Sequence, residues 1–176
     1  MMTEIDLWST RLYEFYFSED QIDASRLELD AYRNKNSKNK QSPALYYTTF
    51  NNPTILDAGD ATSELLSLVE WQITKHTKQK WTINSSWVNY VPKNNVHSMH
   101  RHGDDNMMCG ILYYDNIGGT DFYDPRVQIY NDVAQEIKSE KGKCILFPGW
   151  LMHEMYPHNE EVERVTLPFN MNRVEL

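Results

Sequence analysis

The sequence contains no long apolar run, and none approaches the roughly 20 residues that a membrane-spanning helix needs. The N-terminal stretch MMTEIDLWST carries acidic side chains where a secretory signal would carry lysine or arginine. Both absences argue against a membrane partner and against export. We therefore expect a soluble, cytoplasmic protein.

Cysteine and basic residues are scarce. The only cysteines, Cys109 and Cys144, each lie inside an apolar segment, so we expect buried thiols and no disulfide. The 17 lysines and arginines are outnumbered by 25 acidic residues, which leaves a formal charge of −8. Proteins that bind nucleic acid usually gather basic residues on one face. Nucleic acid is therefore not expected as a partner, and the basic stretch 33–40 is expected to be a solvated loop.

The length of 176 residues, 40% of them hydrophobic, suits one domain over residues 1–176. Within it we expect an α/β preamble over 1–80 and a β core over 81–172 that carries the site. Ser18 is a plausible N-cap, and apolar residues recur at spacings of three and four in a later segment. The expected elements are a strand over Leu7–Phe17, a helix from Glu19 to about Arg33, a strand over Ala44–Phe50 and a helix from Ala61 to about Thr77.

From Trp81 onward the hydrophobic period changes to two, and short strands alternate with turn signals such as Gly118-Gly119 and Pro148-Gly149. Six to eight strands without long helices between them indicate a sandwich or jelly roll. The fold class is therefore mostly β (α+β), with the two earlier helices packed on one sheet.

The densest group of metal-ligand side chains lies within residues 97–105. In an extended chain, His100, His102 and Asp104 share one face, while His97 and Asp105 point the other way. A further ligand is expected from a later strand, where His153 stands between Leu151 and Met155. Two histidines and one carboxylate favour iron(II), whereas zinc more often recruits cysteine or a third histidine.

Arg164 lies in the strand-like segment VERVTLPFN. Alternation turns Arg164 and Thr166 to the interior and Val165 and Leu167 toward the helices. A buried guanidinium needs an anionic partner, and a carboxylate such as that of 2-oxoglutarate can satisfy it with paired hydrogen bonds. The structural alternative is an internal salt bridge to an acid such as Asp124.

The stretch Trp87 to Asn170, about half of the chain, resembles the 2-oxoglutarate/iron(II) oxygenases of the double-stranded β-helix class, a group common in bacteria and in phages of cyanobacteria. The matching pieces are SWVNYV, HRHGDD, CGILYY, FYDPR, KGKCILFPGWLMHEMYP and ERVTLPFN. The resemblance implies a cupin-like jelly roll that uses Fe(II), 2-oxoglutarate and O₂ to hydroxylate a substrate. It also implies that 2-oxoglutarate chelates the iron and that its far carboxylate meets Arg164 and Thr166.

Some residue roles stay open under this resemblance. Relatives carry H-x-H-P, whereas here Gly103 and Asp104 follow the second histidine, so the metal motif has two registers. His102, Asp104 and His153 bind iron in the first, which we favour; His100 and His102 join His153 in the second. Tyr113 or Tyr114 is implied as a donor to the far carboxylate. Asn89 and Arg126 are implied on the substrate side of the pocket.

Two other classes of protein are compatible with this pattern. One is a cupin-like metal-binding or structural protein that does not turn over 2-oxoglutarate. The other is an isomerase or thiol dioxygenase with a three-histidine site, which would have no use for an inward Arg164. The primary substrate is not indicated by the sequence, because the fold alone does not decide it. A homodimer also stays open.

Overall fold

The structure of the protein is a computed structural model, and it describes residues 2–7, 10–37, 46–50, 54–103, 106–123 and 134–174. Four residues singled out by the sequence lie outside this described part: Asp104, Asp105, Asp124 and Arg126. The expected strand over 44–50 and the basic stretch 33–40 are described only in part.

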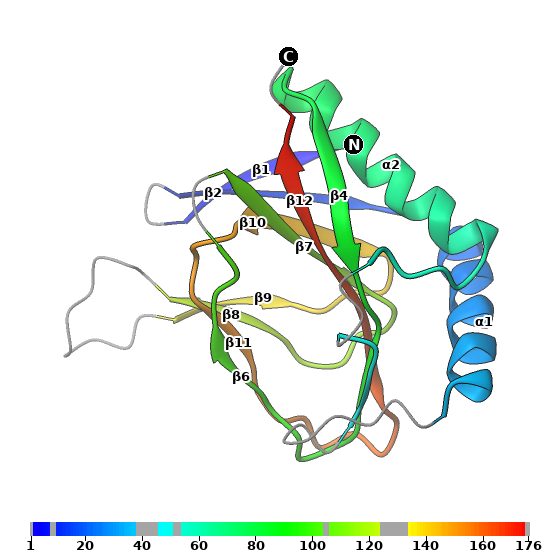
Figure 1. Cartoon of the computed structure of the whole chain (residues 1–176). Helices are drawn as coiled ribbons and strands as arrows, with labels where there is room; N and C mark the ends of the chain where they lie inside the picture. The colour runs from blue at the N-terminus through cyan, green and yellow to red at the C-terminus, as the bar shows by residue number, and fades with distance from the viewer. Residues whose placement is uncertain are drawn as a thin grey trace.

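A large antiparallel sheet forms the centre of the molecule (Figure 1). Its spatial order is β1 (Thr3–Leu7), β2 (Thr10–Tyr16), β10 (Lys143–Pro148), β7 (Met107–Tyr113), β12 (Arg164–Arg173), β5 (Asn89–Val91) and β3 (Tyr47–Thr48), and β4 (Trp81–Ser86) also pairs with β12. Strands from the preamble therefore join the same sheet as the strands of the β core.

A second, smaller antiparallel sheet packs against one face of the large sheet. Its order is β6 (His97–His100), β11 (His153–Met155), β8 (Gly119–Tyr123) and β9 (Ala134–Lys138). Two antiparallel sheets packed face to face form the expected jelly roll. This confirms the predicted fold class.

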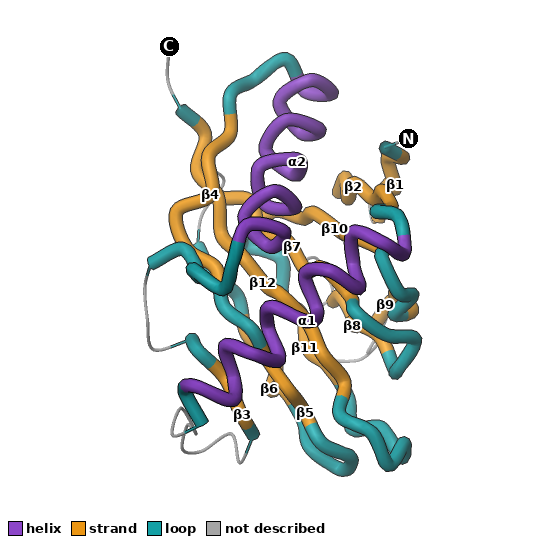
Figure 2. The backbone as a smooth tube through the Cα atoms, turned by 90° about the vertical axis from the view of Figure 1, so that its right-hand side faces the viewer, coloured by secondary structure: helices purple, strands orange, loops and turns teal. Residues whose placement is uncertain are grey.

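Two helices, α1 (Glu19–Lys35) and α2 (Asp60–Thr77), cover the other face of the large sheet (Figure 2). Ser18 caps α1 as expected, and it forms a capping box with Gln21. The N-cap of α2 is Gly59, which offers no side-chain cap. The Glu28 carboxylate of α1 supplies one instead, because it accepts hydrogen bonds from the backbone N–H groups of Ala61 and Thr62 at 2.9 and 2.8 Å.

The apolar side chains fall into two layers on the two faces of the large sheet. Alternation along β12 sends Val165, Leu167 and Phe169 into the layer beneath the helices, as predicted. The layer between the two sheets holds Leu12, Cys109, Ile111, Tyr113, Phe122, Ile145, Phe147, Leu151 and Met155. Both cysteines are free and buried. The inner layer of the sandwich therefore forms one side of the site described next.

Two expected elements differ from the structure, and one strand of the structure was not expected. The segment Leu7–Phe17, expected as one strand, belongs to a hairpin in which Ile5 of β1 pairs with Leu12 of β2. Only Tyr47–Thr48 forms a strand in the described part of the segment 44–50. Strand β9 was not expected, because its side chains are mostly polar and its outer positions face solvent.

Candidate metal and co-substrate site

Three histidines converge at one end of the small sheet. His100 ends β6 and pairs with His153 at the start of β11, and His102 follows β6. The backbone N–H groups of His102 and Gly103 both donate to the Gly149 carbonyl, at 2.9 and 3.1 Å, which holds this segment in place. One ring nitrogen from each of the three histidines lies within 4.8 Å of the others.

Backbone carbonyls fix the proton positions of two of these rings. His100 Nδ1 lies 2.7 Å from the Ser98 carbonyl, and His153 Nδ1 lies 2.9 Å from the Leu151 carbonyl. A carbonyl only accepts, so each Nδ1 carries the proton and each Nε2 keeps a lone pair. Burial lowers the pKa of His153 to about 3 and that of His102 to about 4, so these rings are neutral. Three neutral imidazoles suit a divalent transition metal.

His97 also lies in this cluster, which corrects the expectation that it points to the opposite face. Its Nε2 lies 3.3 Å from His100 Nε2. The cause is a register shift. His100 pairs with His153 and His97 pairs with Met155, so three residue steps along β6 lie opposite two steps along β11. Such a bulge reverses the alternation and returns His97 to the face of His100.

Arg164 is fully buried, with 0% of its surface exposed, and it is incompletely bonded. Its Nη1 donates to the Tyr156 carbonyl at 3.0 Å, but Nε and Nη2 have no hydrogen-bond partner among the described residues. Burial lowers the pKa of Arg164, although the nearby Asp115 carboxylate favours its charged form. Gly118, at φ +68°, lies against this side chain, because a Cβ there would meet Nη1 at 2.8 Å. Asp124, the salt-bridge partner in the structural alternative, lies outside the described residues.

Three polar side chains form a row beside Arg164. Thr166 pairs with Asn89 of β5 on one side and with Tyr113 of β7 on the other, so all three project from the same face. Within the described part of the chain, the buried Thr166 Oγ1 and Asn89 Oδ1 have no partner. The Tyr113 hydroxyl is bonded to Thr120 Oγ1 at 2.7 Å. Unpaired buried donors and acceptors are costly, and a bound polar ligand would satisfy them.

Of the two predicted tyrosines, only Tyr113 lies on the side of Arg164. The Tyr114 hydroxyl is bonded to Ser25 Oγ of α1 at 2.7 Å, in the layer beneath the helices. The strand alternation forces this, because adjacent residues project from opposite faces. The Tyr114 hydroxyl therefore lies on the opposite face of the large sheet from Arg164.

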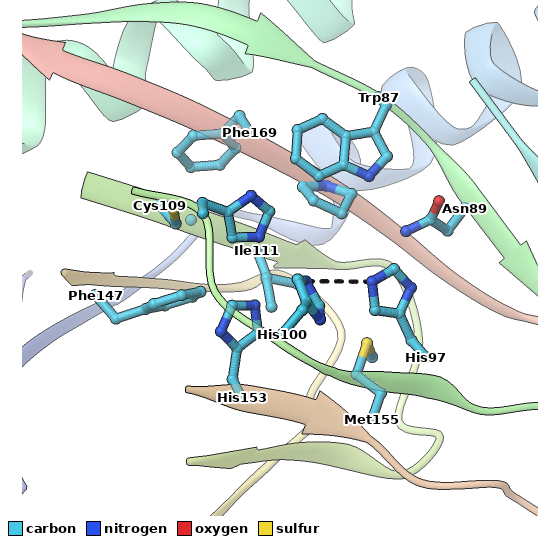
Figure 3. A pocket seen from close by; sticks show the side chains of 13 residues that line it. Trp87, Asn89, His97, His100, Cys109, Ile111, Phe147, His153, Met155 and Phe169 are labelled. Atoms are coloured by element: carbon cyan, nitrogen blue, oxygen red, sulfur yellow. Dashed lines mark hydrogen bonds between the residues drawn. The ribbon is translucent and has the colours of Figure 1, made fainter. Parts of the chain in front are cut away.

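A small cavity of about 20 Å³ lies between the histidines and the inner face of the large sheet (Figure 3). It is lined by Trp87, Asn89, His97, His100, His102, Cys109, Gly110, Ile111, Phe147, His153, Met155, Pro168 and Phe169. Asn89 connects this cavity to the Thr166 row. A wider cleft of about 820 Å³ shares Trp87, His97, His100 and His102 with the cavity, and Tyr46, Phe50, Met99 and Arg101 are among its other lining residues.

Three residues of this site were not singled out as site residues by the sequence. Trp87 is 4% exposed, its Nε1 has no partner among the described residues, and its ring lies 5.8 Å from that of His102. It precedes Asn89 by two positions, so the alternation that indicated Asn89 could also have indicated Trp87. Tyr46 had no comparable signal. His97 belongs to the histidine cluster that the sequence indicated, but strand alternation assigned it to the opposite face, because the bulge depends on a strand that is distant in the sequence.

The described residues contain the donor set of the second metal register, namely His100, His102 and His153. The first register, which we favoured, needs Asp104, and that residue lies outside the described part. Arg164 and Thr166 have the inward orientation that the sequence predicted. Neither described helix is long and apolar enough to cross a membrane.

Solved structures share this fold at low sequence identity. A prolyl-4-hydroxylase from Pseudomonas putida aligns with a TM-score of 0.64 and 15% identity over 97% of this chain and 96% of that one. HygX from Streptomyces hygroscopicus, solved with nickel and 2-oxoglutarate bound, has a TM-score of 0.68 and 11% identity over 93% of this chain and 82% of that one. The carbocyclase SnoK of nogalamycin biosynthesis is described as non-heme and alpha-ketoglutarate-dependent. It has a TM-score of 0.69 and 8% identity over 92% of this chain and 79% of that one. No curated protein matches the sequence.

Residues 85–170, just under half of the chain, match the model of a family described as "Putative 2OG-Fe(II) oxygenase". This stretch contains Asn89, the four clustered histidines, Arg164 and Thr166. The chain is therefore an enzyme, an iron(II)- and 2-oxoglutarate-dependent oxygenase. Within that class it resembles the matched family, as its motifs predicted. Iron(II) and 2-oxoglutarate are its cofactor and co-substrate.

Proposed function

We propose that His100, His102 and His153 hold the iron, that Arg164 and Thr166 bind the remote carboxylate of 2-oxoglutarate, and that the enzyme hydroxylates a substrate that enters through the 820 Å³ cleft. The incomplete bonding of Arg164 is the observation that carries this proposal. A buried guanidinium with free donors costs stability unless an anion completes its hydrogen bonds.

The residues fit the groups that the family implies. Three imidazole nitrogens offer a metal site, and Arg164 with Thr166 offers paired donors for a carboxylate. The two parts adjoin, because Asn89 lines the histidine cavity and pairs with Thr166. A thiol dioxygenase or isomerase could use the three histidines, but it would leave Nε and Nη2 of Arg164 without a hydrogen-bond partner.

Bound iron, with 2-oxoglutarate and O₂, supplies oxidation of a substrate C–H bond coupled to conversion of 2-oxoglutarate into succinate and CO₂. The chain supplies the positions. The hydrogen bonds of His100 and His153 to backbone carbonyls orient their rings, as ligand histidines require. Ile111, Phe147 and Met155 line the cavity with apolar surface, which excludes water from the metal side.

Anaerobic titration of the metal-loaded enzyme tests this proposal. With iron(II) bound, 2-oxoglutarate should produce the visible charge-transfer band of the chelate. Arg164→Leu should weaken 2-oxoglutarate binding by about two to three orders of magnitude, since breaking a buried ion pair costs roughly 3–5 kcal/mol. Iron(II) affinity should not change, because the arginine is not a ligand.

Arg173→Leu is the matched control, because Arg173 lies on the same strand and is exposed. It should leave both affinities unchanged. If Arg164→Leu bound 2-oxoglutarate as tightly as the wild-type enzyme, Arg164 would be a structural residue. A wild-type enzyme that bound iron without consuming 2-oxoglutarate would instead support the cupin-like alternative.

A further inference from the structure

His97 has no role in the proposed triad, yet it occupies a defined place beside it. Its Nε2 lies 3.3 Å from His100 Nε2, and its Nδ1 lies 2.6 Å from the Tyr46 hydroxyl. His97 is not among the three histidines whose ring nitrogens lie within 4.8 Å of one another. It lines both the small cavity and the wide cleft. Its position is therefore at the boundary between the metal site and the substrate entrance.

One backbone carbonyl sets the donor and acceptor in each hydrogen bond that links Tyr46, His97 and His100. His100 Nδ1 donates to the Ser98 carbonyl, so His100 Nε2 can only accept. His97 Nε2 must then be the donor in the contact between the two rings. A neutral His97 consequently has an unprotonated Nδ1, which accepts the hydrogen bond of the Tyr46 hydroxyl. Tyr46 is buried, and burial raises its pKa to about 12, so the phenol keeps its proton.

The lone pair that His97 uses is the one that a metal needs. A metal bound to His100 Nε2 leaves the His97 Nε2–H without its acceptor, while Tyr46 still holds the ring in the same tautomer. His97 is partly buried, and a donor that is partly shielded from water gains from a new acceptor nearby. The positive charge of Arg164 acts electrostatically on both His97 and Tyr46.

We propose that His97 is a further co-substrate-binding residue, whose Nε2–H donates to a carboxylate oxygen of 2-oxoglutarate once a metal occupies His100, and that Tyr46 is a positioning residue that fixes the donor tautomer. This inference rests on the proposed function. It assigns His97 to the ligand and not to the metal. Metal binding and 2-oxoglutarate binding are thereby coupled through one proton that changes its acceptor.

The first test reads tautomers directly in the wild-type enzyme. With ¹⁵N-labelled histidine, long-range NMR correlations distinguish protonated from unprotonated ring nitrogens. In the metal-free protein, His97 should carry its proton on Nε2, and His100 on Nδ1. After zinc is added as a diamagnetic metal, the His100 Nε2 signal should shift and His97 should keep its proton on Nε2. A His97 protonated on Nδ1, or one whose own nitrogen binds zinc, would overturn the inference.

The second test measures two affinities in variants. His97→Leu removes the donor, and 2-oxoglutarate affinity should fall about tenfold to a hundredfold, the scale of a hydrogen bond to a charged group. Its metal affinity should be equal or higher, because nothing competes for the His100 lone pair. His97→Gln, whose amide can donate from the position of Nε2, should restore most of the 2-oxoglutarate affinity. Tyr46→Phe should weaken it by less than His97→Leu does.

The outcomes separate this inference from the proposed function. His76→Leu, on the exposed face of α2, is the control and should change neither affinity. Loss of metal affinity in His97→Leu would make His97 a metal ligand and overturn the inference. Unchanged 2-oxoglutarate affinity in a folded His97→Leu variant would overturn it as well. If the wild-type enzyme itself failed to bind 2-oxoglutarate, the proposed function would fail first.

Discussion

At the scale of single residues, the site depends on histidine protons that the backbone has already placed. The carbonyls of Ser98 and Leu151 hold the Nδ1 protons of His100 and His153, so both Nε2 atoms are ready to bind without a change of tautomer. Burial keeps the pKa values of these rings low, so protons do not compete with the metal near neutral pH. The protein has therefore arranged the ligands before the metal arrives.

Removing a ligand from such a set should abolish tight metal binding. His102→Ala and His153→Ala each leave too few donors to hold iron(II), so we expect the enzyme to lose stoichiometric iron and all succinate production. Iron content after gel filtration, measured by a colorimetric chelator, checks this. His76→Ala should keep full iron content. A variant that retained iron with unchanged affinity would remove that histidine from the site.

Asp104 decides between the two registers that the sequence left open. In the first register, Asp104→Ala removes a ligand, and iron affinity and activity should fall as they do for His153→Ala. In the second, His100 takes that place, and Asp104→Ala should keep both. The same iron assay with His100→Ala gives the complementary result.

The sequence predicted some of these residues because their signals are local. Strand alternation was enough to turn Arg164 and Thr166 inward, and a buried arginine indicated an anion. His97 could not be placed in this way, because the bulge between β6 and β11 depends on the pairing with His153 and Met155. A bulge reverses alternation, and the sequence of one strand does not contain it.

At the scale of secondary structure, the start of α2 is capped by a side chain from α1. Gly59 gives α2 no cap of its own, and a Cβ at that position would lie 2.3 Å from the Glu28 carboxyl carbon. Glu28 therefore joins the two helices that cover the large sheet. Burial raises its pKa, but hydrogen bonds from Thr62 and Ala61 outweigh that effect and leave the pKa lowered.

Glu28→Ala should destabilise the fold at pH 7 by about 1 kcal/mol, the usual cost of losing a helix cap. Because the pKa of Glu28 is lower in the folded state, its contribution is present above the unfolded value of 4.5 and is lost as pH falls through the folded value. Urea unfolding at pH 7 and at about pH 3 should therefore show a difference that shrinks in acid. Glu64→Ala, exposed on α2, serves as control. A difference that did not depend on pH would mean that Glu28 acts by packing and not by charge.

The sequence predicted helices better than short strands. The capping box at Ser18 and the apolar stripe of α2 are local signals, and both helices agree with the structure to within two residues. The first strand was wrong in extent because WST gives no turn signal between β1 and β2. Strand β9 was not predicted, because its residues Gln135, Glu136 and Lys138 are typical of loops. Only the pairing with β8 identifies them as a strand.

At the scale of the whole molecule, the groups that lower the stability of the free enzyme lie in its functional site. Within the described residues, most of the unpaired buried polar atoms belong to the site, namely to Trp87, Asn89, Arg164 and Thr166. Groups of this kind lower the stability of the free protein and gain partners when a ligand binds. The thermal stability of the fold is therefore expected to rise strongly when the co-substrate binds.

Thermal unfolding of Arg164→Leu should show this exchange of stability for binding. With nickel present and 2-oxoglutarate at a hundred times its Kd, the wild-type Tm should rise by about 5–10 °C, since such binding adds about 2.7 kcal/mol to a domain of this size. Arg164→Leu should lose this rise, while its Tm without ligands should be no lower than that of the wild type, because a buried cation with free donors is gone. Arg173→Leu should keep the full rise. A ligand-free Tm that falls sharply, with the 2-oxoglutarate response intact, would show that Arg164 stabilises the fold as an internal ion-pair partner and does not bind 2-oxoglutarate.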